Sequence, residues 1–345
     1  MLSIQDARVQ FSGDPGFLNT ASAGLPPMAS LEALHRALVT WGAGQAQPQD
    51  YDSCVDSARG SFARLVGVPV EAVAQGSQLS VFAGLVAASL PDGAEVVAVE
   101  NDFTSVLFPF LTQRRGVHVR LVPLADVVQA VRPSTRLVAL SAVQSSDGAL
   151  ADLDSIAQAA EAYGAQTFLD ITQAAGWLPI DASRFDYVAC SAYKWLLCPR
   201  GAAFFAVRRE RIDDLLPINA NWYAGADIWG SIYGGPLHLA DDARRFDLSP
   251  AWLAWVGAAP ALGLLDSVGI ESVQAHNVGL ANRFRAGLGL SAGNSAIVTV
   301  TVPGADERLR RAGISTAVRA GRIRLSFHLY NDAADVDLAL VALTD

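Results

Sequence analysis

The strongest constraint on this fold is an alternation of short apolar segments with segments of helical spacing. The apolar segments are rich in Val, Leu and Ala, as strands covered on both faces are; they are EVVAVE, VHVRLVP, RLVALSAV, QTFLDI and DYVACSA. The clearest helix between them, LDSIAQAAEAY, ends at Gly164, a common C-terminal stop. This alternation predicts a parallel sheet with right-handed crossovers.

Two features modify that sheet. The segment AAFFAVR follows DYVACSA after a connection too short for a helix, so we expect it to lie antiparallel. A smaller unit is predicted near the C-terminus, with a strand, a helix and a strand over AIVTVTV, DERLRRAG and RIRLSFH. The predicted fold is therefore α/β, a three-layer sandwich with a mixed, mostly parallel sheet and a smaller C-terminal α/β domain. We expect the large domain over residues 14–247 and the small one over 1–13 and 248–345.

Composition narrows the class of protein. Of 345 residues, 51% are hydrophobic, which is too many for a disordered chain, and the net charge of -9 argues against nucleic-acid or anionic-membrane partners. The most apolar stretch is cut by Pro260 and stopped at Asp266, short of membrane length. Three cysteines and an N-terminus without signal-peptide character favour a reducing compartment, so we expect a cytoplasmic protein with a small-molecule substrate.

Lysine is almost absent from this chain. Lys194 is the single lysine, and every other basic position is arginine. Arginine serves equally well on a solvated surface, but only a lysine can be tuned to lose its proton and attack a carbonyl. The neighbours Trp195 and Leu196 provide apolar surroundings that lower an amine pKa. Chance retention of one lysine is the alternative interpretation.

Three groups of polar residues fall at predicted strand ends, where open α/β sheets bind ligands. Ser77 and Gln78 end a strand and open a helix, whose free N–H groups suit a phosphate. Asp170 ends QTFLDI, and Ser191 and Lys194 follow the next strand. Taken alone, Ser77 and Gln78 would be an ordinary turn and Asp170 would be a helix cap. Together, a phosphate cradle, an acid and a reactive amine are what pyridoxal phosphate requires.

The chain also resembles a known family. The run FLDITQAAGWLPIDASRFDYVACSAYKWLLCPRGAAFFAVR contains, in order, an Asp, a Gln three residues later, Ser-x-Tyr-Lys and Cys-Pro-x-Gly. This pattern is similar to the signature of class V aminotransferases, which with cysteine desulfurases and related epimerases are fold-type I pyridoxal-phosphate enzymes. The resemblance extends from FLNTASAGLPP to RIRLSFHLYN.

The resemblance implies a role for each matching residue. Lys194 would form the Schiff base (aldimine) with pyridoxal 5'-phosphate, and Asp170 would hold the pyridine nitrogen. The other cofactor contacts would be Gln173 with the ring hydroxyl, Phe103 stacked on the ring, and Ser77, Gln78, Ser191 and Tyr193 with the phosphate. Ser249 would reach the phosphate of a partner subunit, which implies a homodimer with shared active sites. Asn19 and Arg324 would bind the substrate, although Arg322 lies on the same strand face and could take the carboxylate instead.

Three departures and several unassigned residues limit this comparison. Ser145 stands where many relatives have Asn, the C-terminal unit is short, and no cysteine follows Cys198, which disfavours cysteine desulfuration. The histidines are scattered without metal-ligand spacing, so no metal is expected. His328 alone lies close to Arg324 in sequence. The aromatic residues between 217 and 247 are expected to pack that loop onto the protein rather than line a pocket.

The sequence therefore predicts an enzyme that acts on an amino acid and takes its α-proton with Lys194. We expect transamination, the commonest activity of the family, with a C–S (β-elimination) lyase or an epimerase as alternatives. A non-catalytic sensor of a phosphate ligand is the alternative of another class. A nicotinamide-dependent dehydrogenase is disfavoured because no G-x-G-x-x-G turn follows a strand.

Overall fold

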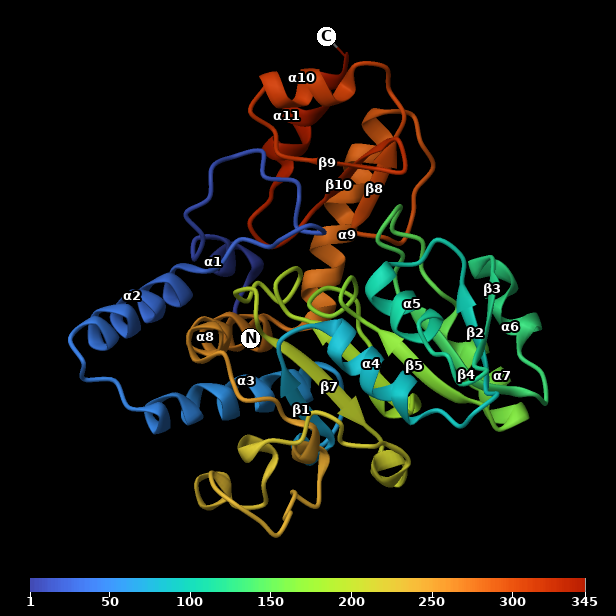
Figure 1. The fold of residues 1–345 in the computed structure, drawn as a ribbon. Helices are drawn as coiled ribbons and strands as arrows, with labels where there is room; N and C mark the ends of the chain where they lie inside the picture. Colours follow the sequence, from blue (N-terminus) through green and yellow to red (C-terminus); the bar gives the residue numbers. More distant parts are fainter. Residues whose placement is uncertain (345) are drawn as a thin grey trace.

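A seven-stranded sheet forms the centre of the molecule (Figure 1). The computed structural model describes residues 1–344. The strands lie in the order β1-β7-β6-β5-β4-β2-β3; β7 is antiparallel to both of its neighbours and the other pairs are parallel. They are β1 (Val73–Gly76), β2 (Glu95–Val99), β3 (His118–Val122), β4 (Thr135–Ser141), β5 (Gln166–Asp170), β6 (Tyr187–Ser191) and β7 (Ala203–Val207). The mixed, mostly parallel sheet is confirmed, including the antiparallel AAFFAVR strand.

Helices cover both faces of this sheet. They are α3 (Asp52–Leu65), α4 (Leu79–Ser89), α5 (Thr104–Leu111), α6 (Val127–Ala130), α7 (Leu153–Tyr163) and α8 (Trp252–Val268), while α1 (Ile4–Arg8) and α2 (Met28–Gly42) pack against α8. Successive residues of a strand point to opposite faces. Phe205 accordingly lies in the core layer with α4 and α5, and Phe204 in the layer with α3, α7 and α8. Burial on both faces explains why these strands read as continuous apolar runs.

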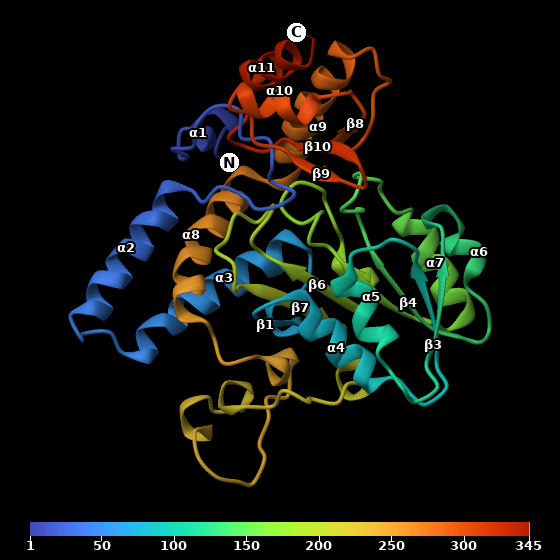
Figure 2. The same cartoon turned by 45° about the horizontal axis from the view of Figure 1, so that its top comes forward.

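A second, three-stranded sheet lies beyond the carboxyl ends of the parallel strands (Figures 1 and 2). Its antiparallel strands β8 (Ile297–Val300), β10 (Arg322–Ser326) and β9 (Ala317–Arg319) pack on α9 (Ile270–Gly287), α10 (Ala305–Arg311) and α11 (Ala333–Thr344). The predicted strand-helix-strand order is confirmed. The helices α9 and α11 and the short strand β9 were not predicted. The boundaries of the two domains remain a prediction.

The chain between residues 217 and 247 contains only short 3-10 turns and projects from the side away from the small sheet (Figures 1 and 2). The rings of Trp222 and Trp229 lie 5.0 Å apart, and Trp229 Nε1 and Tyr223 Oη donate to the Asp52 carboxylate of α3. Tyr223 and Trp229 therefore pack the loop onto the protein, as expected from the sequence, but Trp222 and Tyr233 also line a cavity within the loop, which was not expected. Tyr233 is 92% exposed.

Within residues 1–344, no single helix is long and apolar enough to cross a membrane. The helices α8 and α9 satisfy the length and composition test only as a pair, and they are bent by 85° where they meet.

Candidate active site

The segment that carries Lys194 turns sharply after β6. Leu197 has a φ of 60°, a left-handed conformation that is rare for a branched residue, and its N–H donates to the Lys194 carbonyl at 3.1 Å. Two glycines, Gly24 and Gly176, pack closely against this turn. A Cβ on Gly24 would lie 2.1 Å from the Lys194 carbonyl oxygen, and one on Gly176 would lie 2.2 Å from that of Trp195. The backbone position of the lysine is thus fixed by close contacts that only glycine allows.

Substitution of Gly176 tests this packing. Gly176 has a φ of 107°, so Gly176→Ala adds both backbone strain and a clash with the Trp195 carbonyl. We expect a loss of roughly 2–4 kcal/mol in the free energy of unfolding, measured by urea denaturation. Gly263→Ala is the matched control, because Gly263 lies in α8 with no atom near its added methyl group, and it should be neutral or slightly stabilising. Equal stability of the two variants would contradict the account.

The Lys194 amine is buried without a conventional partner. Its Nζ lies 5.2 Å from the centre of the Phe103 ring and 5.7 Å from that of Tyr193. Among residues 1–344 it has no hydrogen bond or ion pair within ordinary distance. Burial lowers the pKa of Lys194 to about 8; the Asp170 carboxylate opposes this shift and the Arg324 guanidinium adds to it. A substantial fraction of the amine is therefore unprotonated and nucleophilic just above neutral pH.

Asp170 ends β5, next to the strand that leads to the lysine. Burial raises the pKa of its carboxyl to about 6, against hydrogen bonds with Thr172, whose N–H donates to Oδ1 at 2.8 Å. Lys194 also lowers this pKa, and the nearby Asp102 raises it. The Ser141 hydroxyl lies between the two acids, 2.6 Å from Asp102 Oδ1 and 3.4 Å from Asp170 Oδ2. Thr172, Ser141 and Asp102 were missed from the sequence.

Ser77, Gln78 and Ser191 meet at the start of α4. The first helical N–H, that of Leu79, donates to Ser191 Oγ at 3.1 Å, which ties the end of β6 to this helix. Gln78 is the N-cap residue but makes no side-chain capping bond, and Ser77 and Gln78 are exposed. The first turn of α4 therefore has N–H groups available for an anion.

The segment before Ser249 is held firmly against β1. The Leu248 N–H donates to the Gln75 carbonyl at 3.1 Å, and Asp247 forms a fully buried ion pair with Arg59 at 2.7 Å. Ser249 itself is exposed. It therefore sits on the surface beside the strand that leads to Ser77, and its predicted contact with a partner subunit is not tested by this single chain.

Gln173 and Arg324 are linked through Ser145. The Gln173 Nε2 group donates to Ser145 Oγ at 3.1 Å, and its Oε1 accepts from Trp195 Nε1 at 2.7 Å. Arg324 donates from Nη1 to Ser145 Oγ at 3.2 Å and to the Ser145 carbonyl, and from Nη2 to Ser22 Oγ at 2.8 Å. Ser145 therefore links the Arg324 guanidinium to the Gln173 amide.

Arg324 is buried without an acid beside it. It is 1% exposed, its Nε has no partner, and none of the ion pairs among residues 1–344 includes it. Arg322, the alternative clamp, instead pairs with Asp147 at 3.3 Å. An unpaired buried guanidinium is costly unless an anion completes it, which favours Arg324 as the carboxylate ligand. Asn19 is adjacent to the same strand through a bridge with Ser326, and its Oδ1 is buried without a partner.

Tyr193 and His328 support the lysine turn. The Arg200 guanidinium lies 5.1 Å from the centre of the Tyr193 ring, and burial raises the pKa of this phenol. His328 is fully buried, with Nε2 2.9 Å from the Trp195 carbonyl oxygen and Nδ1 3.3 Å from Asn277 Nδ2. Burial lowers the pKa of His328 to about 3, so the ring is neutral and can donate to the carbonyl. Its contact is with the lysine segment rather than with the amine.

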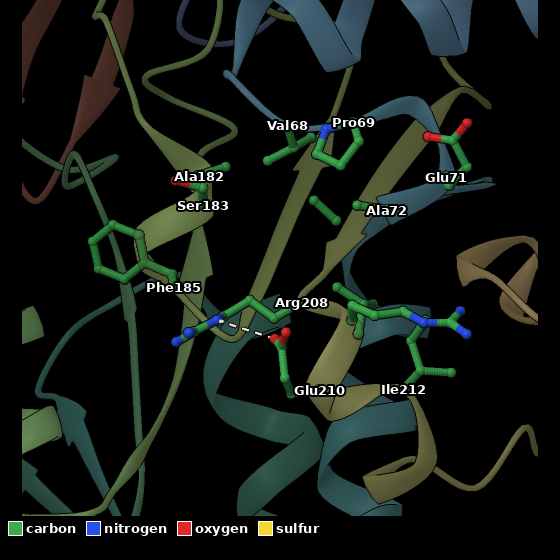
Figure 3. A pocket seen from close by; sticks show the side chains of 13 residues that line it. Val68, Pro69, Glu71, Ala72, Ala182, Ser183, Phe185, Arg208, Glu210 and Ile212 are labelled. Carbon is green, nitrogen blue, oxygen red and sulfur yellow. Dashed lines mark ion pairs between the residues drawn. The ribbon is translucent and has the colours of Figure 1, made fainter.

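A separate cavity of about 340 Å³ lies at the opposite end of the sheet (Figure 3). Its lining includes Ala72 before β1, Phe185 before β6 and Val207 at the end of the antiparallel β7. These positions mark the amino ends of the parallel strands, whereas Asp170, Ser191 and Lys194 gather at the carboxyl ends. Open α/β sheets bind their ligands at the edge formed by the carboxyl ends of the parallel strands.

Comparison with known proteins identifies the family. The model of aminotransferase class-V matches residues 45–302. The chain belongs to the class V aminotransferase family. The uncharacterized aminotransferase YcbU of Bacillus subtilis is 30% identical over 308 residues, covering 82% of this chain and 81% of that protein. Isopenicillin N epimerase of Streptomyces clavuligerus is 29% identical over 286 residues, covering 72% and 70% of the two chains.

Solved structures support the same fold. C-DES, in a mutant with glycine covalently linked to its PLP cofactor, superimposes with a TM-score of 0.88 at 21% identity and covers 98% of this chain and 99% of its own. The cysteine desulfurase CsdA from Escherichia coli superimposes with a TM-score of 0.84 at 19% identity, covering 100% and 98%. The fold-type I architecture of this class V protein is thereby confirmed. These likenesses give no support to the expectation that cysteine desulfuration is disfavoured, and that expectation rests only on the cysteine positions.

Class V enzymes use pyridoxal 5'-phosphate, and this is the cofactor of the chain. The residues present fit it. The unpaired Lys194 amine, the buried Asp170 carboxyl and the uncapped α4 N-terminus would hold its aldehyde, pyridine nitrogen and phosphate. The exposed Phe103 ring, whose centre lies 5.2 Å from the amine, would stack on the cofactor ring.

Proposed function

We propose that this class V enzyme transaminates an amino acid. The observation that carries the proposal is the buried Lys194 amine, whose lowered pKa suits both covalent attachment and proton transfer near neutral pH. When bound, pyridoxal phosphate supplies an aldehyde that condenses with amines and a ring that withdraws electrons from the substrate α-carbon. The protein supplies orientation and proton movement.

Each residue has a definite task in this scheme. Lys194 Nζ would hold the cofactor aldehyde and would take the α-proton of the substrate. The Asp170 carboxylate, which accepts from the Ser141 hydroxyl and the Thr172 N–H, would accept a hydrogen bond from the protonated pyridine nitrogen and favour its charged form. One lysine can take a proton and return it on the same face, as transamination requires. Epimerisation requires a second proton donor on the other face.

Arg324 would bind the substrate carboxylate, with the Asn19 amide beside it. Its guanidinium is oriented by Ser145 and Ser22, which are neutral and leave its charge uncompensated. A planar guanidinium fixes a carboxylate through two parallel hydrogen bonds. This contact would orient the α-carbon toward Lys194.

Replacing Arg324 should weaken substrate binding more than it slows the chemistry. For Arg324→Gln we expect KM to rise by roughly 10 to 100-fold with a smaller change in kcat, because a charge-assisted contact made in the ground state is lost. Steady-state kinetics with the best substrate would measure this. Arg322→Gln serves as control, since Arg322 is engaged with Asp147, and it should leave KM nearly unchanged. The reverse pattern would assign the clamp to Arg322.

Analysis of the products distinguishes transamination from the alternative reactions. The holoenzyme is incubated with a panel of amino acids, with and without a keto-acid acceptor, and the products are identified. Formation of the matching keto acid, with the amino group transferred to the acceptor, supports transamination. Pyruvate and a released β-substituent would show a C–S lyase instead, and racemised substrate would show an epimerase. No turnover with a firmly bound phosphate ligand would favour the non-catalytic sensor.

We also propose that the enzyme is a cytoplasmic homodimer in which Ser249 reaches the partner's phosphate site. Two observations support this contact: Ser249 is exposed, and the neighbouring Arg59–Asp247 pair fixes its segment beside β1. Sedimentation measurements would give the oligomeric state. Ser249→Ala should then weaken cofactor retention without changing that state.

A further inference from the structure

The small sheet presents three arginines on one face. Arg319 of β9 is directly opposite Arg322 of β10, and Arg324 is two residues further along β10. Because side chains alternate along a strand and cross-strand partners share a face, all three guanidiniums lie on the same side. The other side carries Ile323 and Leu325, which pack into the core with α9 and α11. The arginine face is therefore the one turned toward the lysine site.

Only one of these charges is balanced. Arg322 pairs with Asp147 at 3.3 Å. Arg324 and Arg319 form no ion pair with the residues that the structure describes, and both donate to one neutral atom, Ser22 Oγ, at 2.8 and 3.4 Å. Like charges on a shared acceptor repel, and no carboxylate of residues 1–344 pairs with either guanidinium to offset this repulsion.

The two unbalanced charges also act on the reactive amine. Burial lowers the pKa of Arg324 to about 10, and the proximity of Arg319 adds to this shift. Arg319 likewise lowers the pKa of Lys194. In a protein of net charge -9, positive charge is thus concentrated near Lys194. Arg324 is buried, whereas Arg319 on the neighbouring strand is exposed, so the two guanidiniums differ in their access to solvent.

We propose that the substrate is an amino acid with a second anionic group, a side-chain carboxylate, that Arg319 binds while Arg324 holds the α-carboxylate. This inference rests on the proposed function. One substrate carboxylate satisfies one guanidinium bidentately and leaves the other unpaired. A dicarboxylic substrate pairs both and removes their repulsion. Arg319 thereby selects acidic over neutral amino acids of the same length.

Binding of unreactive ligands to the holoenzyme tests the proposal. Succinate and butyrate have four carbons each and no amine, and they differ only in the second carboxylate. By calorimetry at low ionic strength, we expect succinate to bind at least about 10-fold more tightly than butyrate. Arg319→Gln should remove this preference by weakening succinate binding more than butyrate binding. Arg36→Gln, which alters an exposed arginine on α2, is the matched control and should retain the preference.

The outcomes separate this inference from the proposed function. Equal or absent binding of the two ligands by the wild-type holoenzyme, or a preference that survives Arg319→Gln, overturns the inference. In either case a yellow protein whose cofactor is fixed to Lys194 by borohydride would leave the proposed function standing. A protein that takes up no cofactor would overturn the proposed function itself.

Discussion

Lys194→Ala should abolish turnover. Without the amine, no group at this position can hold the cofactor aldehyde or take the α-proton, and positioned proton transfer alone contributes up to about 10⁴-fold to rates. We therefore expect the single-turnover rate of product formation to fall by roughly 10⁴-fold or more with the best amino acid found in the panel. The assay is single-turnover formation of product, which avoids dependence on cofactor recycling.

The control for this variant separates charge from reactivity. Lys194→Arg keeps a cation at the site but cannot release its proton near neutral pH, so it should be as inactive as the alanine variant. Unfolding of both variants should remain cooperative, because the lysine side chain itself makes no hydrogen bond or ion pair with the described residues. Full activity in either variant would reject the assignment.

Asp170→Asn should lower turnover by roughly 10²–10³-fold, the usual cost of removing one preorganised electrostatic contact from an active site. Asparagine keeps the shape of the carboxyl and can still accept from the Thr172 N–H. It cannot carry the negative charge that holds a protonated ring nitrogen. The measurement is kcat at saturating cofactor, so that weaker cofactor binding does not contribute.

The same substitution should stabilise the cofactor-free protein at neutral and higher pH. Burial raises the pKa of Asp170 to about 6 from an ordinary value near 3.8, so the folded state disfavours the charged form. The resulting destabilisation is absent below pH 4, grows between pH 4 and 6, and is complete above pH 6, where it is on the order of 3 kcal/mol. Part of the gain is offset because Lys194 loses a carboxylate that favours its protonated form.

Urea denaturation of the wild type and Asp170→Asn at pH 4 and pH 8 measures this difference. The two proteins should be nearly equal at pH 4, and the variant should be more stable at pH 8. A variant that is less stable at pH 8 would mean that the carboxylate is structural. The expected combination of higher stability and lower activity is typical of a residue retained for function.

Much of the fold was predictable because its signals are local. The central strands are buried on both faces and therefore read as apolar runs, and Gly164 ends α7 in the left-handed conformation that its position predicts. The antiparallel β7 followed from the shortness of one connection. By contrast, α9 begins directly after Gly269, so it merges with α8 in sequence, and the apolar residues of α11 lack a clear helical period.

In the candidate site, too, the residues with local sequence signals were predictable and those without such signals were not. Residues at strand ends, such as Asp170 and Lys194, could be placed from topology alone, since parallel strands bring their carboxyl ends to one edge. The supporting residues could not. Ser22 binds Arg324 although the two residues lie about three hundred positions apart in sequence. Gly24 packs against the Lys194 carbonyl. Nothing in the sequence around Ser22 or Gly24 indicates these contacts. Arg319 is one exposed arginine among many until the strand register places it beside Arg324.

Borohydride reduction followed by peptide mapping tests the central claim most directly. The purified protein is loaded with pyridoxal phosphate, reduced, digested and analysed by mass spectrometry. The account predicts one modified peptide, with the reduced cofactor attached to Lys194 in the sequence SAYKWLLCPR. A protein that binds the cofactor but yields no adduct at Lys194 after reduction would contradict it.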